Sequence, residues 1–553
     1  MSQLKIISLG GMGSVTQNMY VYEYEDEMML VDCGIGFPDS YMPGVDVLIP
    51  DIRYILDSIE KGKKIVGLVF SHGHDDHIAA APYLFGRLPE FPMYASPLTA
   101  RFAEERLHDG GVARKVTAVA DSDPVQIGTH FSIRLIPVTH SVPDTRHIAI
   151  TTPEGVIYHG SDFKIDQTPV DGQKTDEALI RQISSEGVLC MLIDSLRVER
   201  EDETPSEKSV GPYIDATMSE TQGKYIVTLM SSHIHRIQQV VDAAEKYKRK
   251  VVFIGRSVEQ NVKLSMELKK LHIPAGMLVD KRDSKDYKDQ ELCMIVAGSQ
   301  GQEGSSLMRA IYGEHPMLMI HPTDTVVFSA DAIPGNEVNF YSAIDELCRN
   351  RVPVIYPSIL PGIHSSGHAS MPEQRMMLEW VRPKYVMPIG GADRHRYLFY
   401  DRVAAPLGYT PETVLLPNSG DVLGFANGSV STVDSLTLQP QVVDGLGIGD
   451  VGPVVLSDRR ILSQAGIVTV VIPRHKREYL LKEVAVVSRG FIFMKDAEEV
   501  VEFIKQTVAE IVTEQQNQLK DDELRKTIER RLSRKLYKII QREPMIVSVI
   551  LDV

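Results

Sequence analysis

The sequence predicts an α/β protein of several domains, and three observations support this fold class. The chain has 553 residues, too many for one core, and this length indicates about three or four domains of roughly 150 residues each. Hydrophobic residues make up 43% and charged residues 24%, which is typical of folded globular proteins and excludes a disordered or fibrous chain. Short apolar runs, typical of strands, alternate with amphipathic stretches that are typical of helices.

This alternation is irregular in the first part of the chain and regular in the middle. Strands are predicted at residues 65–70 and 155–158, and helices at residues 51–60 and 97–107. From about residue 210, buried strands separated by helical segments are predicted at residues 224–230, 250–254 and 293–297. This regular order indicates an inserted domain with a parallel sheet.

The last third of the chain contains a further strand, a polar segment and a tail. A strand predicted at residues 352–357 begins a stretch that runs to about Asn427. The polar residues 427–434 predict a linker, which we place at residues 431–445. Residues 446–553 then form a separate C-terminal domain, and we find no internal repeat.

Composition narrows the location and the partners of the protein. The cysteines Cys33, Cys190, Cys293 and Cys348 form no CxxC pair, so neither a disulfide framework nor a thiolate zinc site is indicated. There is no signal-peptide core and no run of the roughly 18 apolar residues that span a membrane. We therefore expect a cytoplasmic protein without a membrane partner. Because the formal net charge is −15, any contact with nucleic acid needs local basic patches.

The most informative motif is a cluster of metal-ligand residue types directly after a predicted strand. His72, His74, Asp76 and His77 form the pattern HxHxDH after the apolar residues 65–70. Three imidazoles and one carboxylate provide ligands for two neighbouring transition-metal ions. The alternative is a polar loop with chance histidines, which the spacing after a buried strand disfavours.

Two more candidate ligands stand where later strands end. These are His140, and Asp162, whose two carboxylate oxygens can bridge two ions. Taken alone, His140 would be a core or surface histidine and Asp162 a turn residue, and only the HxHxDH motif favours the metal interpretation. His159 lies inside a strand-like run, so we expect a structural role for it.

The ordered set of these motifs resembles a known superfamily. Asp32, His72, His74, Asp76, His77, His140 and Asp162 resemble the metal-binding motifs of the metallo-β-lactamase superfamily. Asp194 and the segment His364-Ser365-Ser366-Gly367-His368 resemble further motifs of the β-CASP nucleases. Residues 10–13 with 18–20, 162–164 with 168–171, 333–337 and 542–545 resemble the ribonuclease J family, and the likeness spans nearly the whole chain.

The resemblance implies both a fold and a function. The fold is an αββα metallo-β-lactamase sandwich at residues 1–209 and 351–430, a parallel-sheet β-CASP domain at 210–350 and a small α+β domain at 446–553. The function is metal-dependent hydrolysis of RNA, 5′-to-3′ exonucleolytic with endonuclease activity, in rRNA processing and mRNA decay. The implied partners are single-stranded RNA with a 5′-monophosphate and further copies of the chain, as a homodimer or homotetramer.

The resemblance also assigns roles to single residues. One zinc ion is assigned to His72, His74 and His140, a second to Asp76 and His77, and Asp162 bridges them. Asp32 orients a ligand histidine. Asp76, Asp194 and His368 are assigned as catalytic; His368 protonates the leaving oxygen and Asp194 holds His368.

Two segments are assigned to RNA binding. His364, Ser365, Ser366, Gly367 and His368 contact the phosphate, and the small residues among them independently favour close approach of backbone N–H groups to an anion. A flexible polar loop is the alternative. Ser232 and Arg236 are assigned to a 5′-monophosphate pocket.

Two positions depart from the family pattern. Gly390 stands where the family has its last metal-ligand histidine, so we expect weak binding of the second ion unless water, Asp393 or His395 replaces the ligand; manganese or magnesium are alternatives to zinc. His233 stands where the family has asparagine. These departures keep two other functions open, a catalytically weakened RNA-binding subunit and, less favoured, a small-molecule metallo-hydrolase.

The C-terminal domain contains a basic segment. Residues 524–542 carry eight lysines and arginines against Glu529 alone. Leu524, Ile528, Leu532 and Leu536 recur every four residues, which predicts an amphipathic helix with one buried stripe. The basic face is open to three interpretations: a solvated face, a subunit contact or a phosphate-binding surface.

Overall fold

The computed structural model describes residues 2–39, 41–121, 123–333, 335–439, 441–445, 447–449, 451–476, 478–491, 498–515 and 518–553. Pro334, in one of the segments that carry the resemblance, and Pro440, in the predicted linker, lie outside these residues. The chain forms two compact units, Met1–Phe37 with Ile49–Pro440 and Pro38–Leu48 with Gln441–Val553, and each is described by itself. Among the described residues, no helix has the length and apolar character needed to cross a membrane.

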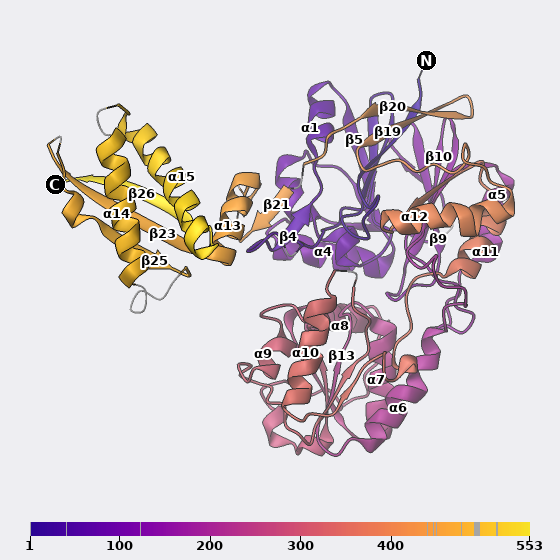
Figure 1. Ribbon diagram of the computed structural model, residues 1–553. Coiled ribbons are helices and arrows are strands. Elements are labelled where there is room, and N and C mark those ends of the chain that lie inside the picture. The colour runs from indigo at the N-terminus through magenta and orange to yellow at the C-terminus, as the bar shows by residue number, and fades with distance from the viewer. Residues whose placement is uncertain are drawn as a thin grey trace. The chain divides into compact units, whose positions relative to one another are not determined.

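Two sheets form the centre of the first unit (Figure 1). The eight-stranded sheet has the order β20(Ser429–Ser435), β19(Asp421–Ala426), β1(Leu4–Gly10), β2(Met19–Tyr24), β3(Glu27–Val31), β5(Lys64–Val69), β6(Met93–Ala95), β7(Thr117–Ala118). The six-stranded sheet has the order β18(Tyr385–Ile389), β12(Val188–Asp194), β11(Gly155–His159), β10(Arg146–Thr152), β9(Phe131–Pro137), β8(Val125–Ile127). One buried apolar cluster contains residues of both sheets, which therefore pack face to face.

Helices cover the outer faces of this sandwich. Helix α1(Arg53–Glu60) precedes β5 of the larger sheet, α2(Asp75–Ile78) and α3(Ala81–Leu84) lie between β5 and β6, and α4(Pro97–Asp109) follows β6. Helices α5(Glu177–Ser185), α11(Met371–Val381) and α12(Asp393–Phe399) share a second buried cluster with the smaller sheet. The arrangement is the αββα metallo-β-lactamase sandwich that the resemblance implies.

A third sheet, in which all strands are parallel, is inserted between β12 and β18. Its order is β14(Lys250–Ile254), β15(Leu292–Val296), β13(Tyr225–Thr228), β16(Thr325–Phe328), β17(Val354–Ile355). Its helices are α6(Gly211–Glu220), α7(Ile234–Lys246), α8(Arg256–Glu267), α9(Ser306–Ile311) and α10(Glu337–Arg349). β17 is the strand that the sequence predicts at 352–357. It pairs with β16, so this segment belongs to the inserted sheet and not, as we predicted, to the returning half of the sandwich.

The two ends of the insertion meet in one sheet. β12 is buried along its whole length and pairs in parallel with both β11 and β18. The register places Asp194 beside Ile389. Because parallel strands end at the same sheet edge, residues that follow β11, β12 and β18 gather there although the insertion separates them in sequence.

The second unit is a small α+β domain. Its main sheet contains β23(Ile467–His475), which pairs with β24(Glu478–Tyr479), β25(Ala485–Arg489) and β26(Met545–Asp552), and its helices are α13(Pro453–Ala465), α14(Glu498–Gln515) and α15(Asp521–Ile540). A smaller sheet joins β4(Val47–Ile49), β21(Gln441–Asp444) and β22(Gly447–Ile448). The linker predicted at 431–445 was therefore wrong for two parts: residues 429–435 form β20 and residues 441–444 form β21. Polar alternation on an exposed edge strand was misread as a loop.

Candidate metal centre and cleft

The candidate metal ligands all follow strand ends of the sandwich. His72 and His74 come directly after the buried strand β5, and His77 lies in the short helix α2. His140 follows β9 and Asp162 follows β11. Strand ends therefore bring together five side chains that are far apart in the sequence.

Three imidazoles and a carboxylate form the first cluster. His74 Nδ1 lies 3.2 Å from Nε2 of both His72 and His140. Asp162 Oδ2 lies 3.6 Å from His72 Nε2 and 3.7 Å from His140 Nε2. Donors held about 2.1 Å from a tetrahedral ion are roughly 3.4 Å apart, so these four atoms have the spacing of a divalent metal site.

The electrostatics of this cluster suit metal binding. Burial lowers the pKa of His74 to about 3 and holds the pKa values of His72 and His140 well below their usual range. Burial acts to raise the pKa of Asp162, but the neighbouring His368 and His77 hold it well below normal. At neutral pH the cluster thus offers three imidazole lone pairs and an ionised carboxylate, which is the donor set that zinc prefers.

His140 is held in place by the segment that follows the insertion. Its Nδ1 atom lies 2.7 Å from the carbonyl oxygen of Gly367, so this nitrogen donates and Nε2 is left for a metal. A Cβ atom at Gly367 would lie 2.8 Å from the His140 ring. From the sequence we assigned Gly367 only to phosphate binding and missed this contact. The feature that could have indicated it is a glycine between the two histidines of the segment His364–His368.

A second group surrounds Asp76 and His77. Nε2 of His77 lies 3.6 Å from Oδ2 of Asp76 and 3.6 Å from Oδ2 of Asp162. Its Nδ1 atom lies 2.7 Å from Oδ2 of the buried Asp32, which also accepts hydrogen bonds from the backbone and hydroxyl of Ser71. Asp32 thus orients His77, as the resemblance implies.

Position 390 gives the second group no further ligand among the described residues. A Cβ atom at Gly390 would lie 3.5 Å from Oδ1 of Asp194 and 3.9 Å from Oδ1 of Asp162, so position 390 faces this centre. Neither proposed substitute belongs to a metal-ligand group in the described part of the chain. Asp393 pairs with Arg396 at 3.1 Å, and His395 lies 3.8 Å from Glu199.

His368 and Asp194 form a charged pair beside the metal ligands. Nδ1 of His368 lies 2.7 Å from Oδ2 of Asp194, and Nε2 lies 4.0 Å from Oδ2 of Asp162. Burial acts to lower the pKa of His368, but the carboxylates of Asp194 and Asp162 raise it to about 9. His368 is therefore protonated at neutral pH, with a proton on the nitrogen that faces Asp162.

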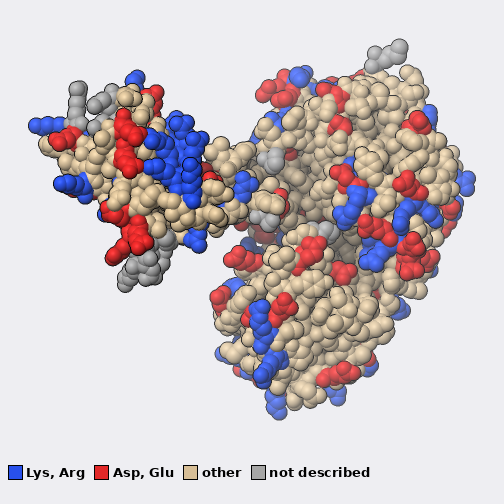
Figure 2. All heavy atoms as spheres, in the orientation of Figure 1, with Lys and Arg blue, Asp and Glu red and all other residues tan. Residues whose placement is uncertain are grey.

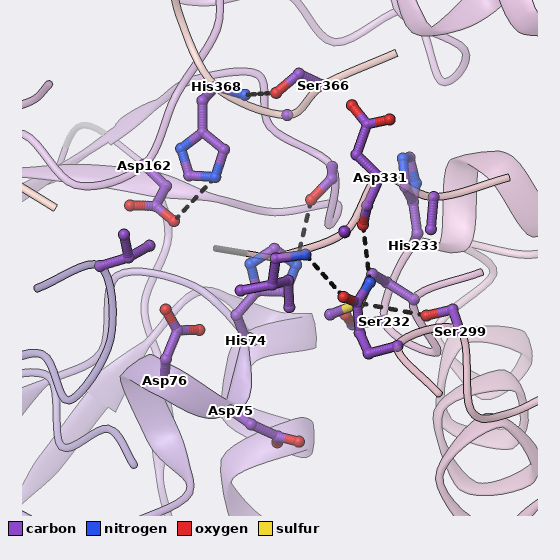
Figure 3. A pocket seen from close by; sticks show the side chains of 18 of the residues that line it. His74, Asp75, Asp76, Asp162, Ser232, His233, Ser299, Asp331, Ser366 and His368 are labelled. Atoms are coloured by element: carbon purple, nitrogen blue, oxygen red, sulfur yellow. Dashed lines mark hydrogen bonds and ion pairs between the residues drawn. The ribbon is translucent and has the colours of Figure 1, made fainter. Parts of the chain in front are cut away.

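His74, Asp76, Asp162 and His368 open into a cleft of about 490 Å³ between the sandwich and the inserted domain, and the other candidate ligands lie behind them. Figure 3 shows Asp76, Asp162 and His368 on one side of it and Ser232, His233 and Ser299 on the other. His364, Ser365, Ser366 and Gly367 also line it, so the structure brings together nearly all residues that the sequence assigns to the site.

Arg236 lies apart from both the cleft and the candidate metal ligands. Its side chain is fully buried and does not line the cleft. Its guanidinium contacts Glu207 at 2.5 and 2.6 Å, Ser329 and the carbonyl of Ser365. Its donors are therefore used inside the protein, and the assignment of Arg236 to RNA contact was wrong; it supports the loop that carries His364.

His233 takes the place beside Ser232 on the cleft wall. It is the N-cap residue of α7 and is 3% exposed. Burial lowers its pKa to about 4, so it is neutral at pH 7. The start of α7 consequently presents the Ser232 hydroxyl and a neutral imidazole at this wall, while the backbone N–H groups of Ile234 and Arg236 are used in hydrogen bonds within the turn.

Comparisons with known proteins agree with this architecture. Family models match at residues 12–163 (metallo-beta-lactamase superfamily), 222–347 (ribonuclease J, beta-CASP domain) and 454–553 (ribonuclease J C-terminal domain). Ribonuclease J of Thermus thermophilus is 34% identical over 557 residues, which cover 99% of this chain and 95% of the relative. Ribonuclease J2 of Bacillus subtilis is 33% identical over 555 residues, which cover 100% and 99%.

A solved structure shares the fold. It is a protein of unknown function from Enterococcus faecalis V583, with a TM-score of 0.54 and 14% identity over 76% of this chain and 100% of that chain. The shared fold alone does not identify a family, but the full-length relatives and the three matched domain models do. This chain belongs to the ribonuclease J family of the metallo-β-lactamase superfamily and carries a cluster of histidine and aspartate side chains that could hold a metal ion.

Proposed function

We propose that this protein is a metal-dependent ribonuclease that hydrolyses phosphodiester bonds of single-stranded RNA in the cleft. The observation that carries the proposal is the meeting of a metal-ligand cluster and a protonated histidine in one cleft that two domains line. Family membership makes RNA the substrate class. More specifically, we propose that it degrades RNA exonucleolytically from the 5′ end, also cuts RNA internally, and takes part in rRNA processing and mRNA decay.

The metal ligands divide into a complete and an incomplete set. His72, His74, His140 and Asp162 would hold one divalent cation, and Asp76, His77 and Asp162 would hold a second more weakly. Zinc fits the three imidazoles best, whereas manganese or magnesium suits the more carboxylate-rich second set. Such cations lower the pKa of water and neutralise charge on a phosphate.

His368 would act as general acid. Its protonated Nε2 lies beside the metal ligands, where it can give a proton to the leaving oxygen as the P–O bond breaks. Asp194 accepts the hydrogen bond of Nδ1 and keeps the ring charged. In this role Asp194 is a positioning residue, which acts through His368.

The opposite wall would bind the RNA chain. The Ser232 hydroxyl and the positive end of the α7 dipole would form a site for a terminal phosphate, because helix N-termini attract anions. This arrangement supports a preference for 5′-monophosphorylated RNA. The segment from His364 to Gly367 would contact the scissile phosphate.

A second candidate is a catalytically weakened subunit that binds RNA or a partner nuclease, and Gly390 favours it. A small-molecule metallo-hydrolase has no use for the cleft wall of the inserted domain and is set aside. We further propose a cytoplasmic protein that assembles as a homodimer or homotetramer.

The test is digestion of RNA labelled at the 5′ or the 3′ end, with 5′-monophosphate, triphosphate or hydroxyl termini. Release of mononucleotides from the 5′ end, fastest on the monophosphate and stopped by a chelator, supports the proposal. Binding without hydrolysis at any metal concentration would instead support the weakened subunit.

A further inference from the structure

Helix α15 and the residues just after it carry more lysines and arginines than the ion pairs and hydrogen bonds of the domain engage. Of the eight lysines and arginines at residues 524–542, four are engaged by neighbours. Arg531 lies 2.7 Å from Glu514, and Lys535 lies 2.7 Å from Glu510, so these two pairs join α15 to α14. Arg525 pairs with Asp522, and Arg542 donates to the carbonyl of Phe491.

The other four cations are Lys526, Arg530, Arg534 and Lys538. All four are exposed, and none has an ion pair or a side-chain hydrogen bond within the described part of the chain. They recur every four residues, so neighbouring members are about 6 Å apart along the axis and the set spans about 18 Å. We refer to them as the outer basic stripe.

The outer basic stripe faces away from the domain core. Each member stands two residues after a buried member of the series Leu524, Ile528, Leu532 and Leu536. Two residues turn a helix by about 200°, so the stripe lies opposite the buried face. Figure 2 shows the resulting dense patch of lysine and arginine over α15. Four like charges at this spacing repel one another and do not pack against the core. The stability of the domain therefore does not explain why they are present.

An exposed aromatic side chain lies along the same face. Tyr537 is 52% exposed and stands three residues after Arg534 and directly before Lys538. A row of cations with an aromatic ring beside it suits a nucleic-acid single strand, whose phosphates meet the cations and whose bases stack on the ring.

We propose that the outer basic stripe of α15 is a second RNA-binding surface, separate from the cleft, that holds the phosphates of a single strand outside the cleft. The proposal rests on the proposed ribonuclease function for the choice of RNA. An acidic protein surface would also meet the cations, but it gives no reason for the exposed tyrosine or for a row that follows one line. In a chain of net charge −15 such a surface also restores local attraction for RNA.

The test compares the full-length protein with the variant Lys526→Gln/Arg530→Gln/Arg534→Gln/Lys538→Gln. The probe is a phosphorothioate single-stranded RNA of about 40 nucleotides, which resists cleavage and exceeds the roughly 16 nucleotides that one binding fold covers. Fluorescence anisotropy gives its affinity at several salt concentrations. Four lost phosphate contacts make the log–log salt dependence shallower by about 3, so raising the salt fourfold weakens the wild type about 50-fold more than the variant.

The control variant neutralises four scattered, exposed lysines of the other unit, Lys61, Lys115, Lys248 and Lys269. It changes the net charge equally and should keep the wild-type salt dependence. A Tyr537→Ala variant should weaken binding severalfold without changing the salt slope.

Cleavage of a short RNA that fills only the cleft separates this proposal from the proposed function. The stripe variant should cleave it at the wild-type rate; absence of cleavage in both proteins would refute the ribonuclease function while the binding experiment still judges the stripe. Equal salt slopes for the wild type and the stripe variant would overturn the proposal. A slope change accompanied by a lower mass in light scattering would also overturn it, because the stripe would then be a subunit contact.

Discussion

The two halves of the metal centre share Asp162 but differ in how many ligands they have. The half with His72, His74 and His140 has three imidazole nitrogens, two of them 3.2 Å from the third. The other half has Asp76 and His77, and Gly390 where a further ligand would face it. Each half has one partly buried member, His74 or Asp76, among buried ones, so burial does not distinguish the halves. The comparison teaches that ligand number, set by one residue after β18, should decide how strongly each half binds metal.

The largest effect is expected from breaking the complete half. His74→Ala removes the imidazole that lies between His72 and His140. Loss of the metal should lower the rate by about a thousandfold or more, since a metal supplies several kcal/mol of transition-state stabilisation. Metal analysis and the rate on 5′-monophosphorylated RNA measure this. His272→Ala, which changes an exposed histidine outside the candidate metal groups of the described residues, is the control, and an active His74→Ala protein would refute the assignment of the site.

The next effect comes from breaking the incomplete half. Asp76 is one of only two unshared ligands there, so Asp76→Ala should empty it and reduce hydrolysis by about a hundredfold or more. RNA affinity should persist, because the phosphate contacts lie on the opposite wall and elsewhere. Wild-type turnover in this variant would show that only the three-histidine half takes part in hydrolysis.

The sequence predicted the complete half better than its surroundings. HxHxDH places His72 and His74 of this half side by side, and because β5 is a buried strand the motif has to lie beyond its end. Arg236 was misassigned because a motif cannot show whether a guanidinium points into a cleft or toward a buried partner such as Glu207. The strand β17 was assigned to the wrong domain because strand pairing depends on contacts between distant residues. Gly367 was noted, but its hydrogen bond to His140 required the fold.

An intermediate effect is expected on the pH dependence. The carboxylates of Asp194 and Asp162 raise the pKa of His368 to about 9, so the protonated acid is present at neutral pH and is lost as the pH rises through that value. Asp194→Asn removes one of these charges and lowers the pKa. The alkaline decline of kcat should therefore begin at a lower pH than in the wild type. A simple fall in rate with an unchanged profile would exclude His368 as the acid that Asp194 supports.

The smallest effect is expected from completing the second half. Gly390→His restores an imidazole at a position that faces Asp162 and Asp194. The backbone there has a φ of +66°, which a residue with a Cβ adopts at a cost of about 1 to 2 kcal/mol. We therefore expect a modest gain, a tighter second metal or a severalfold higher rate. Gly390→Ala carries the same strain without the ligand and is the matched control; equal behaviour of the two variants would mean that the added imidazole does not reach the metal.

The most direct test of the unequal halves is to count the metal ions that each protein molecule holds. Native mass spectrometry and anomalous scattering from zinc-loaded protein, before and after a weak chelator, report number and position. We predict one ion retained at His72, His74 and His140 and a second ion, at Asp76 and His77, that the chelator removes. Two ions retained equally, or a single ion at Asp76 and His77, would contradict the account.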